Sequence, residues 1–263
     1  MLKKNLAAQP MKIMGILNVT PDSFADGGKF ETYETAVAHG LQMIAEGVDI
    51  IDIGGESTRP GAERVSAIEE QARIIPVIEK LAQTGIPISV DTMRAETAEL
   101  AIEVGASIIN DVSGGLADKA MHETAAELGC PYILMHWRGH SKEMNSLATY
   151  SDVVNEVANE LQVQIKRALA SGIARNNLII DPGLGFAKDA AQNWELIERI
   201  DEITDIGFPV LIGGSRKRFL GGDSPDSREQ ATIELTRSML AKNIWAVRVH
   251  SVREHKSLVA AHG

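Results

Sequence analysis

The sequence predicts a single-domain α/β protein, a (β/α)8 TIM barrel spanning residues 1–263. Eight short apolar runs rich in Ile and Val recur along the chain, and each is followed by a segment with helical periodicity. Runs that are apolar on both faces are typical of buried parallel strands, and regular alternation of strand and helix predicts a parallel sheet. Eight units without a linker or a second compositional zone favour closure of this sheet into one barrel.

The expected elements alternate along the whole chain. We expect strands at residues 12–19, 49–55, 87–92, 107–112, 132–137, 177–183, 209–215 and 245–250. We expect helices at residues 32–46, 68–83, 95–104, 119–128, 153–170, 190–205, 228–242 and 252–261. An open doubly wound sheet would carry a glycine-rich ligand loop after its first strand, whereas residues 18–24 read NVTPDSF. This loop favours the barrel over the open sheet.

Charge and composition exclude several classes of protein. The chain carries 26 Lys and Arg against 36 Asp and Glu, a net charge of −10. Nucleic acids and membrane surfaces attract basic proteins, so we expect neither as a partner. The single cysteine, Cys130, excludes an intramolecular disulfide and a cysteine-based zinc site. No apolar stretch approaches the ~20 residues of a membrane span, and the N-terminus has no signal-peptide pattern, so we expect a cytoplasmic protein.

Polar residues gather at the carboxyl ends of the expected strands, where the active site of such a barrel lies. Asp91, Asn110 and Asp181 each follow Ile or Val directly. A carboxylate held there needs a partner, because an unpaired charge is costly to bury. Two carboxylates and an amide suit a nitrogen-rich heterocycle with several N–H donors. The alternative, that these are turn residues, is as good for any one position but explains the set less well.

A basic cluster contrasts with the acidic net charge. The expected strand ends carry six basic side chains: Arg59, Arg216, Lys217, Arg218, Arg248 and His250. Barrels often bind phosphate near the last two strands, where Lys217 and Arg248 lie. The preceding Gly213 and Gly214 would let backbone N–H groups approach an anion. A solvated surface run at residues 216–218 is the alternative. The sequence thus favours an anion bound beside a flat heterocycle.

Other chemistries are poorly supported by the sequence. His136 and His140 have the i, i+4 spacing of helical zinc ligands, but Gly139 and a strand end disfavour a helix there. The chain has neither a phosphate loop ending in Gly-Lys-Ser/Thr nor a nucleophile elbow.

Ordered segments along the chain resemble the signatures of the dihydropteroate synthase family. They lie at residues 14–24, 54–62, 89–92, 110–115, 181–186, 215–217 and 248–250. The resemblance covers the chain from about Lys12 to the C-terminus. Residues 135–139 and 216–221 are similar to actinobacterial members of the family.

The resemblance implies a transferase of folate biosynthesis. Its reaction condenses 6-hydroxymethyl-7,8-dihydropterin diphosphate with 4-aminobenzoate, giving 7,8-dihydropteroate and pyrophosphate. The resemblance also implies a homodimer, a Mg²⁺ ion and inhibition by sulfonamides.

Matching positions imply the site residues. Those expected to bind the pterin diphosphate are Thr58, Asp91, Asn110, Asp181, Phe186, Lys217, Arg248 and His250. Those expected around 4-aminobenzoate are Phe24, Arg59, Pro60 and Ser215. Asn18 matches the magnesium-associated residue. Asp91, Lys217 and Arg248 are the expected catalytic residues, with Asp91 stabilising positive charge on the exocyclic methylene.

Two other functions stay open at this point. One is a corrinoid-linked methyltransferase domain on a similar pterin-binding barrel, which would not need the anion residues around Lys217. The other is a non-catalytic pterin-binding paralogue, which would be expected to lose them. The chain departs from the family pattern at Ser251, where an acidic residue usually follows the last histidine. We therefore expect His250 to lack an orienting carboxylate.

Overall fold

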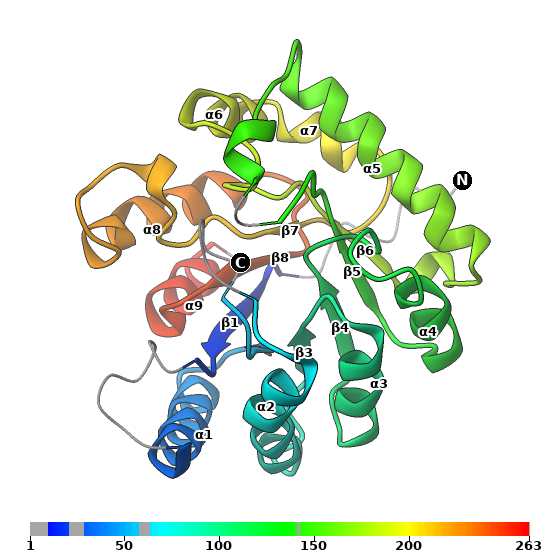
Figure 1. The fold of residues 1–263 in the computed structure, drawn as a ribbon. Helices are drawn as coiled ribbons and strands as arrows, with labels where there is room; N and C mark the ends of the chain where they lie inside the picture. The colour runs from blue at the N-terminus through cyan, green and yellow to red at the C-terminus, as the bar shows by residue number, and fades with distance from the viewer. Residues whose placement is uncertain (1–9, 21–28, 58–63, 141–142, 263) are drawn as a thin grey trace.

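A ring of parallel strands forms the centre of the molecule in a computed structural model that describes residues 10–20, 29–57, 64–140 and 143–262 (Figure 1). The strands are β1 (Lys12–Asn18), β2 (Ile50–Gly54), β3 (Ile88–Asp91), β4 (Ile108–Asp111), β5 (Tyr132–Met135), β6 (Leu178–Asp181), β7 (Leu211–Ile212) and β8 (Ala246–Val249). Their hydrogen-bonded order is β6-β5-β4-β3-β2-β1-β8-β7. The predicted (β/α)8 architecture is confirmed.

The ring closes between β6 and β7 through a parallel bridge from Ile180 to Val210. The amide of Ile180 donates to the carbonyl oxygen of Pro209 at 2.9 Å. The strand expected at residues 209–215 is much shorter in the structure, because Pro209 has no N–H to donate and the glycines at 213 and 214 disfavour extended pairing. This seam is therefore the most weakly paired part of the wall.

Helices surround the ring (Figure 1). They are α1 (Lys29–Ala45), α2 (Ala67–Ala82), α3 (Ala95–Glu103), α4 (Met121–Leu128), α5 (Val153–Ala170), α6 (Ala190–Glu198), α7 (Ile200–Thr204), α8 (Glu229–Met239) and α9 (Val252–Ala260). The helix expected at 190–205 is divided, because Arg199 leaves the helical conformation with a ψ of 23°. None of the helices in the described part of the chain is long and apolar enough to cross a membrane.

Side chains along each strand alternate between the outer and inner faces of the wall. The outward set, which includes Ile51, Ile109 and Leu134, is buried in one core with residues of the surrounding helices. The inward set forms two layers. The lower layer consists of Met14, Ile50, Ser89, Ile108, Ile133, Ile179, Leu211 and Ala246, and it is apolar except for the buried Ser89.

The upper layer lies two residues further along each strand. It consists of Ile16, Asp52, Asp91, Asn110, Met135, Asp181, Gly213 and Arg248. Along β2, β4, β6 and β8 a polar residue thus follows an apolar one on the inner face, so the lower layer forms a largely apolar floor under a polar chamber. The same alternation turns Asp111 outward, where its Oδ2 accepts a hydrogen bond from the hydroxyl of Tyr132 at 2.7 Å.

Truncating the floor should destabilise the barrel. Ile133 is completely buried, so Ile133→Ala leaves a cavity, and we expect the free energy of unfolding to fall by roughly 2–5 kcal/mol in urea denaturation. The matched control is Ile68→Ala, which removes the same atoms from a residue that is 80% exposed. That change should stay within about 0.5 kcal/mol. Equal losses in the two variants would contradict the role given to the floor.

Candidate active site

Arg248 joins the polar residues of the upper layer into one network. Its Nε donates to Oδ2 of Asp52 at 2.5 Å, and its Nη2 donates to Oδ2 of Asp91 at 2.6 Å. The amide nitrogen of Asn110 lies 3.2 Å from each carboxylate oxygen of Asp52. These residues come from β8, β2, β3 and β4, which lie within one continuous run of the sheet, so the pairing and curvature of these strands bring them together.

Burial controls the electrostatics of this network. It raises the pKa of Asp91, Arg248 opposes the shift, and the neighbouring Asp52 adds to it. Burial also acts to lower the pKa of Arg248, but the two carboxylates outweigh it and hold that pKa above its ordinary value. The two contacts use two of the five N–H donors of the guanidinium, so further donors remain for a ligand.

Asp52 is a member of the network that the sequence analysis missed. It lies inside the second strand rather than at its end, and a search of strand ends passes over it. The signal that could have found it is a carboxylate within a run that is otherwise apolar on both faces. Asp52 is completely buried, and such a charge requires partners, which are Arg248 and Asn110 here.

Asp181 ends β6 and faces the same chamber. Its Oδ1 accepts a hydrogen bond from the amide of Gly183 at 2.7 Å, whereas no described residue donates to Oδ2. A Cβ at Gly213 would lie 3.4 Å from that Oδ2, so the absence of a side chain leaves space beside the oxygen. Burial raises the pKa of Asp181, and Lys217 is the strongest influence against this shift. The Oδ2 atom is available to a ligand.

Lys217 reaches the chamber from the loop after β7. Its Nζ donates to the carbonyl oxygen of Leu184 and lies 4.4 Å from the centre of the Phe186 ring. A Cβ at Gly185 would lie 2.7 Å from the Lys217 Cδ, so glycine is needed for this approach. Burial lowers the pKa of Lys217 to about 8, against the attraction of Asp181. A cation and a carboxylate therefore lie close together beside an aromatic ring.

An apolar wall borders the polar chamber. Met93, Val112 and Met135 form a buried cluster, against which Phe186 and Trp137 pack. Of these residues, Phe186 was expected in the site from the family resemblance, whereas isolated methionines and valines carry no signal of chemistry in a sequence. Hydrogen-bonding groups beside an apolar wall suit a flat, polar heterocycle.

The structure divides the basic cluster predicted at residues 216–218. Arg216 has a φ of 56° and turns away from the chamber, and its Nε lies 2.6 Å from a carboxylate oxygen of Glu229 on α8. Arg218 is exposed. Of these three residues, Lys217 is the one that faces the chamber. Arg216 and Arg218 match the alternative expectation of a solvated surface run.

His250 and Ser215 lie together at the ends of β8 and β7. The Nδ1 of His250 is 2.9 Å from the hydroxyl oxygen of Ser215, which also accepts a hydrogen bond from the His250 amide at 3.2 Å. The hydroxyl of Ser251 instead donates to Glu229. Among the described partners of His250, the hydroxyl of Ser215 orients the ring.

Asn18 ends β1 beside Gly54 of β2 and is half-buried. Its side chain makes no hydrogen bond with a described residue. Within residues 10–20, 29–57, 64–140 and 143–262, no group of three His, Cys, Asp or Glu is arranged to hold a metal ion. The remaining predicted site residues lie outside the described residues: Phe24, Thr58, Arg59 and Pro60.

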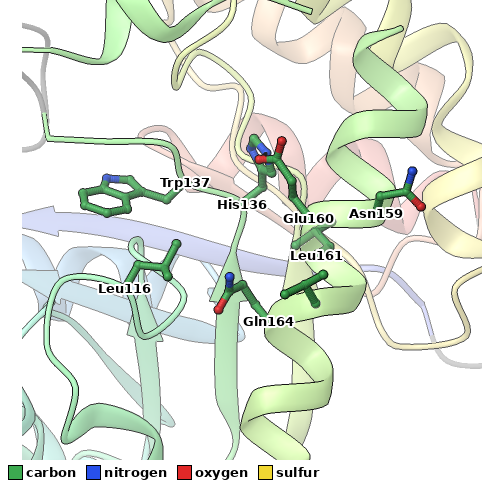
Figure 2. Close-up of a pocket in the computed structure, with 8 residues that line it drawn as sticks. Leu116, His136, Trp137, Asn159, Glu160, Leu161 and Gln164 are labelled. Atoms are coloured by element: carbon green, nitrogen blue, oxygen red, sulfur yellow. Dashed lines mark hydrogen bonds and ion pairs between the residues drawn. The ribbon is translucent and has the colours of Figure 1, made fainter.

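A cavity of about 210 Å³ lies beside the chamber, between the end of β5 and α5 (Figure 2). Leu116, His136 and Trp137 line it together with residues of α5. None of the charged residues of the upper layer lines this cavity. The polar chamber, and not this cavity, is therefore the candidate active site.

Comparisons with known proteins agree with this geometry. The model of a family described as pterin binding enzyme matches residues 14–250. A dihydropteroate synthase of Mycobacterium leprae is 47% identical over 258 residues, covering 94% of this chain and 91% of the relative.

Two solved structures show the same fold. A Xanthomonas albilineans dihydropteroate synthase with 4-aminobenzoic acid has a TM-score of 0.90 and 41% identity, covering 96% of this chain and 92% of the other. A Yersinia pestis dihydropteroate synthase with a sulfonamide drug has a TM-score of 0.90 and 38% identity, covering 96% and 93%. The chain therefore belongs to the pterin-binding enzyme family and, within it, to the dihydropteroate synthases.

Proposed function

We propose that this protein condenses 6-hydroxymethyl-7,8-dihydropterin diphosphate with 4-aminobenzoate to form 7,8-dihydropteroate and pyrophosphate in folate biosynthesis. The observation that carries the proposal is the meeting of two features in one chamber. Asp181 and Asn110 offer hydrogen bonds to a heterocycle, and Lys217 and Arg248 offer positive charge to an anion. The named relatives at 38–47% identity support the same reaction.

Polar side chains meet the hydrogen-bonding edge of the pterin, and apolar side chains meet its flat face. The Oδ2 of Asp181 accepts from the N–H groups of the pterin edge, and the amide of Asn110 lies on the neighbouring side of the chamber. Phe186 and Met135 supply the apolar surface against which the flat ring lies. This arrangement fixes the orientation of the exocyclic methylene before reaction.

The reaction breaks the C–O bond of the methylene and forms a C–N bond. The electron pair of the C–O bond leaves with the diphosphate, beside Lys217, Arg248 and His250. Positive charge develops on the methylene carbon, and the carboxylate of Asp91 stabilises it electrostatically. The lone pair of the aromatic amine then forms the C–N bond, and the nitrogen releases its proton to water. No side-chain nucleophile is required.

The residues present fit a Mg²⁺ ion that arrives with the diphosphate. The chamber holds three carboxylates, Asp52, Asp91 and Asp181, against the cations Lys217 and Arg248, so its own charges do not neutralise a diphosphate. Asn18 offers one carboxamide oxygen, and Mg²⁺ commonly completes its coordination with substrate phosphates and water. When bound, the ion would offset negative charge on the leaving group.

Ser215 is proposed to lie in the 4-aminobenzoate pocket together with Phe24, Arg59 and Pro60. A homodimer, cytoplasmic location and sulfonamide inhibition are further parts of the proposal, as is the expectation of no nucleic-acid partner. The acidic net charge supports the last of these, and the Yersinia pestis relative, solved with a sulfonamide drug, supports inhibition.

The two other functions have less support. A non-catalytic paralogue or a methyltransferase domain does not need a lysine that binds an anion. In this chain, a hydrogen bond to the Leu184 carbonyl holds Lys217 in place, and the missing side chain at Gly185 leaves space for it.

Turnover is the direct test of the function. We expect the purified protein to form dihydropteroate and pyrophosphate in equal amounts from the two substrates, and to restore growth of a folate-pathway auxotroph lacking its own synthase. Binding of the pterin diphosphate without product would favour a non-catalytic protein and contradict the proposal.

Removing the Asp181 carboxylate should weaken pterin binding. Hydrogen bonds to charged groups contribute about 1.5–3 kcal/mol, so Asp181→Ala should raise the Kd for the pterin diphosphate roughly 10- to 150-fold in calorimetry. The matched control is Asp223→Ala at an exposed position, which should leave the Kd unchanged. An unchanged Kd in Asp181→Ala would mean that Asp181 only caps the turn at Gly183.

Lys217 should give the reaction an alkaline limit. Its ammonium, which attracts the diphosphate, is lost as the pH rises through the pKa of about 8, so kcat/KM for the pterin diphosphate should fall above that pH. Arginine stays charged over the accessible range, so Lys217→Arg should lose this alkaline limb whatever its absolute rate. If kcat/KM of Lys217→Arg still falls above the same pH, the alkaline limit belongs to the titration of another group.

A further inference from the structure

Lys188 is a buried lysine behind the chamber, with 9% of its surface exposed. Its Nζ lies 3.0 Å from each of three acceptors: the carbonyl oxygens of Gly183 and Phe186 and the Nδ1 of His136. The reaction described above uses neither Lys188 nor His136. Burying a lysine is costly, so the arrangement requires a role.

The three contacts match the charged form of Lys188, whose pKa burial lowers to about 7 against the attraction of Asp181. The ammonium group has three N–H donors and no acceptor, and three acceptors face it here. Burial and the neighbouring Lys188 charge lower the pKa of His136 to about 4, so the imidazole is neutral. Its Nδ1 then accepts from Lys188, and its Nε2–H donates to Glu160 of α5 at 2.9 Å. Figure 2 shows the Glu160 carboxylate beside the His136 ring.

The two carbonyl groups belong to the loop between β6 and α6, which needs support to keep its shape. Gly183, Gly185 and Ala187 have positive φ angles of 69°, 77° and 47°. A non-glycine residue such as Ala187 adopts this conformation only at a cost in free energy. The Lys188 ammonium bonds the loop near both ends, and the Asn193 side chain accepts from the Gly185 amide at 2.6 Å.

The same loop carries the groups that meet the pterin diphosphate. Phe186 presents its ring to the chamber wall, and the Leu184 carbonyl seats the Lys217 ammonium. Asp181 is linked to the loop through the Gly183 amide. A shift of this loop would therefore displace the aromatic surface and the diphosphate cation together.

We infer that Lys188 is a positioning residue for the pterin diphosphate, acting by holding loop 183–187 against the chamber through the Gly183 and Phe186 carbonyls. The inference rests on the proposed function and identifies the substrate whose binding depends on this lysine. The 4-aminobenzoate residues named above lie on other segments of the chain. The two substrates should therefore respond differently when Lys188 is changed.

The first experiment replaces Lys188 by Met, which keeps the length of the side chain but has no donor. We expect the KM for 6-hydroxymethyl-7,8-dihydropterin diphosphate, and its calorimetric Kd in the absence of 4-aminobenzoate, to rise roughly tenfold or more. The KM for 4-aminobenzoate at saturating pterin diphosphate should change less than about twofold. A purely structural role would reduce the folded fraction, and hence kcat, without this split between substrates.

The matched control is Lys242→Met. Lys242 pairs with Asp201 at 2.5 Å and precedes β8, at the end of the barrel opposite to the chamber. Both KM values should stay at the wild-type level in this variant. Lys188→Gln is the second variant, because its amide keeps donors for part of the acceptor set and disturbs the interior less. It should show an intermediate rise in the pterin KM.

Several outcomes would overturn the inference. One is an unchanged Kd for the pterin diphosphate in Lys188→Met or Lys188→Gln, and another is an equal rise in both KM values. A third is failure of both variants to fold, which would assign Lys188 to the stability of the barrel. Wild-type protein that binds the pterin diphosphate but forms no product would refute the proposed function alone. In that case, the Kd comparison between wild type and variants still decides the role of Lys188. Wild-type protein that does not bind the pterin diphosphate would overturn both.

Discussion

The burial of the Arg248 charge between two carboxylates is the interaction on which the chamber depends. A guanidinium inside a barrel is stable only if nearby charges compensate it, and Asp52 and Asp91 do so from two other strands. Removing either carboxylate would leave the positive charge of Arg248 with one partner fewer in the buried interior of the barrel. The network therefore requires β2, β3 and β8 to keep their register, and it couples the geometry of the site to the pairing of these strands through β1.

The step from apolar floor to polar chamber explains how one strand can serve both stability and chemistry. Ile179 and Asp181 are inward residues of the same strand, as are Ile108 and Asn110. The lower member of each pair fills the interior, and the upper member is held at a fixed height above it. The proposed site thus takes its carboxylates and amide from the strands, while the loops that follow them contribute the aromatic ring of Phe186 and Lys217.

Much of this could be predicted from the sequence, because the eight apolar runs repeat at regular spacing and Asp91, Asn110 and Asp181 mark strand ends. The prediction was incomplete where three-dimensional pairing decides the outcome. Asp52 was missed because its partner Arg248 lies 196 residues away along the chain. Arg216 and Lys217 are adjacent in sequence, yet the positive φ of Arg216 sends them in different directions. The interruption at Arg199 likewise depends on local conformation that residue type does not specify, whereas the brevity of β7 follows from Pro209 and the glycines at 213 and 214.

The seam between β6 and β7 bears on how the molecule responds to heat. Asp181 ends β6 on one side of this seam, and Lys217 lies in the loop after β7 on the other side. Among the described strands, β6 and β7 are joined by the fewest backbone hydrogen bonds, so these two residues lie across the weakest pairing of the wall. Proteins open locally at their least stable contacts before they unfold as a whole. Warming should therefore separate Asp181 from Lys217 while the remaining strands are still paired. We therefore expect the geometry of the site to be lost below the melting temperature of the barrel.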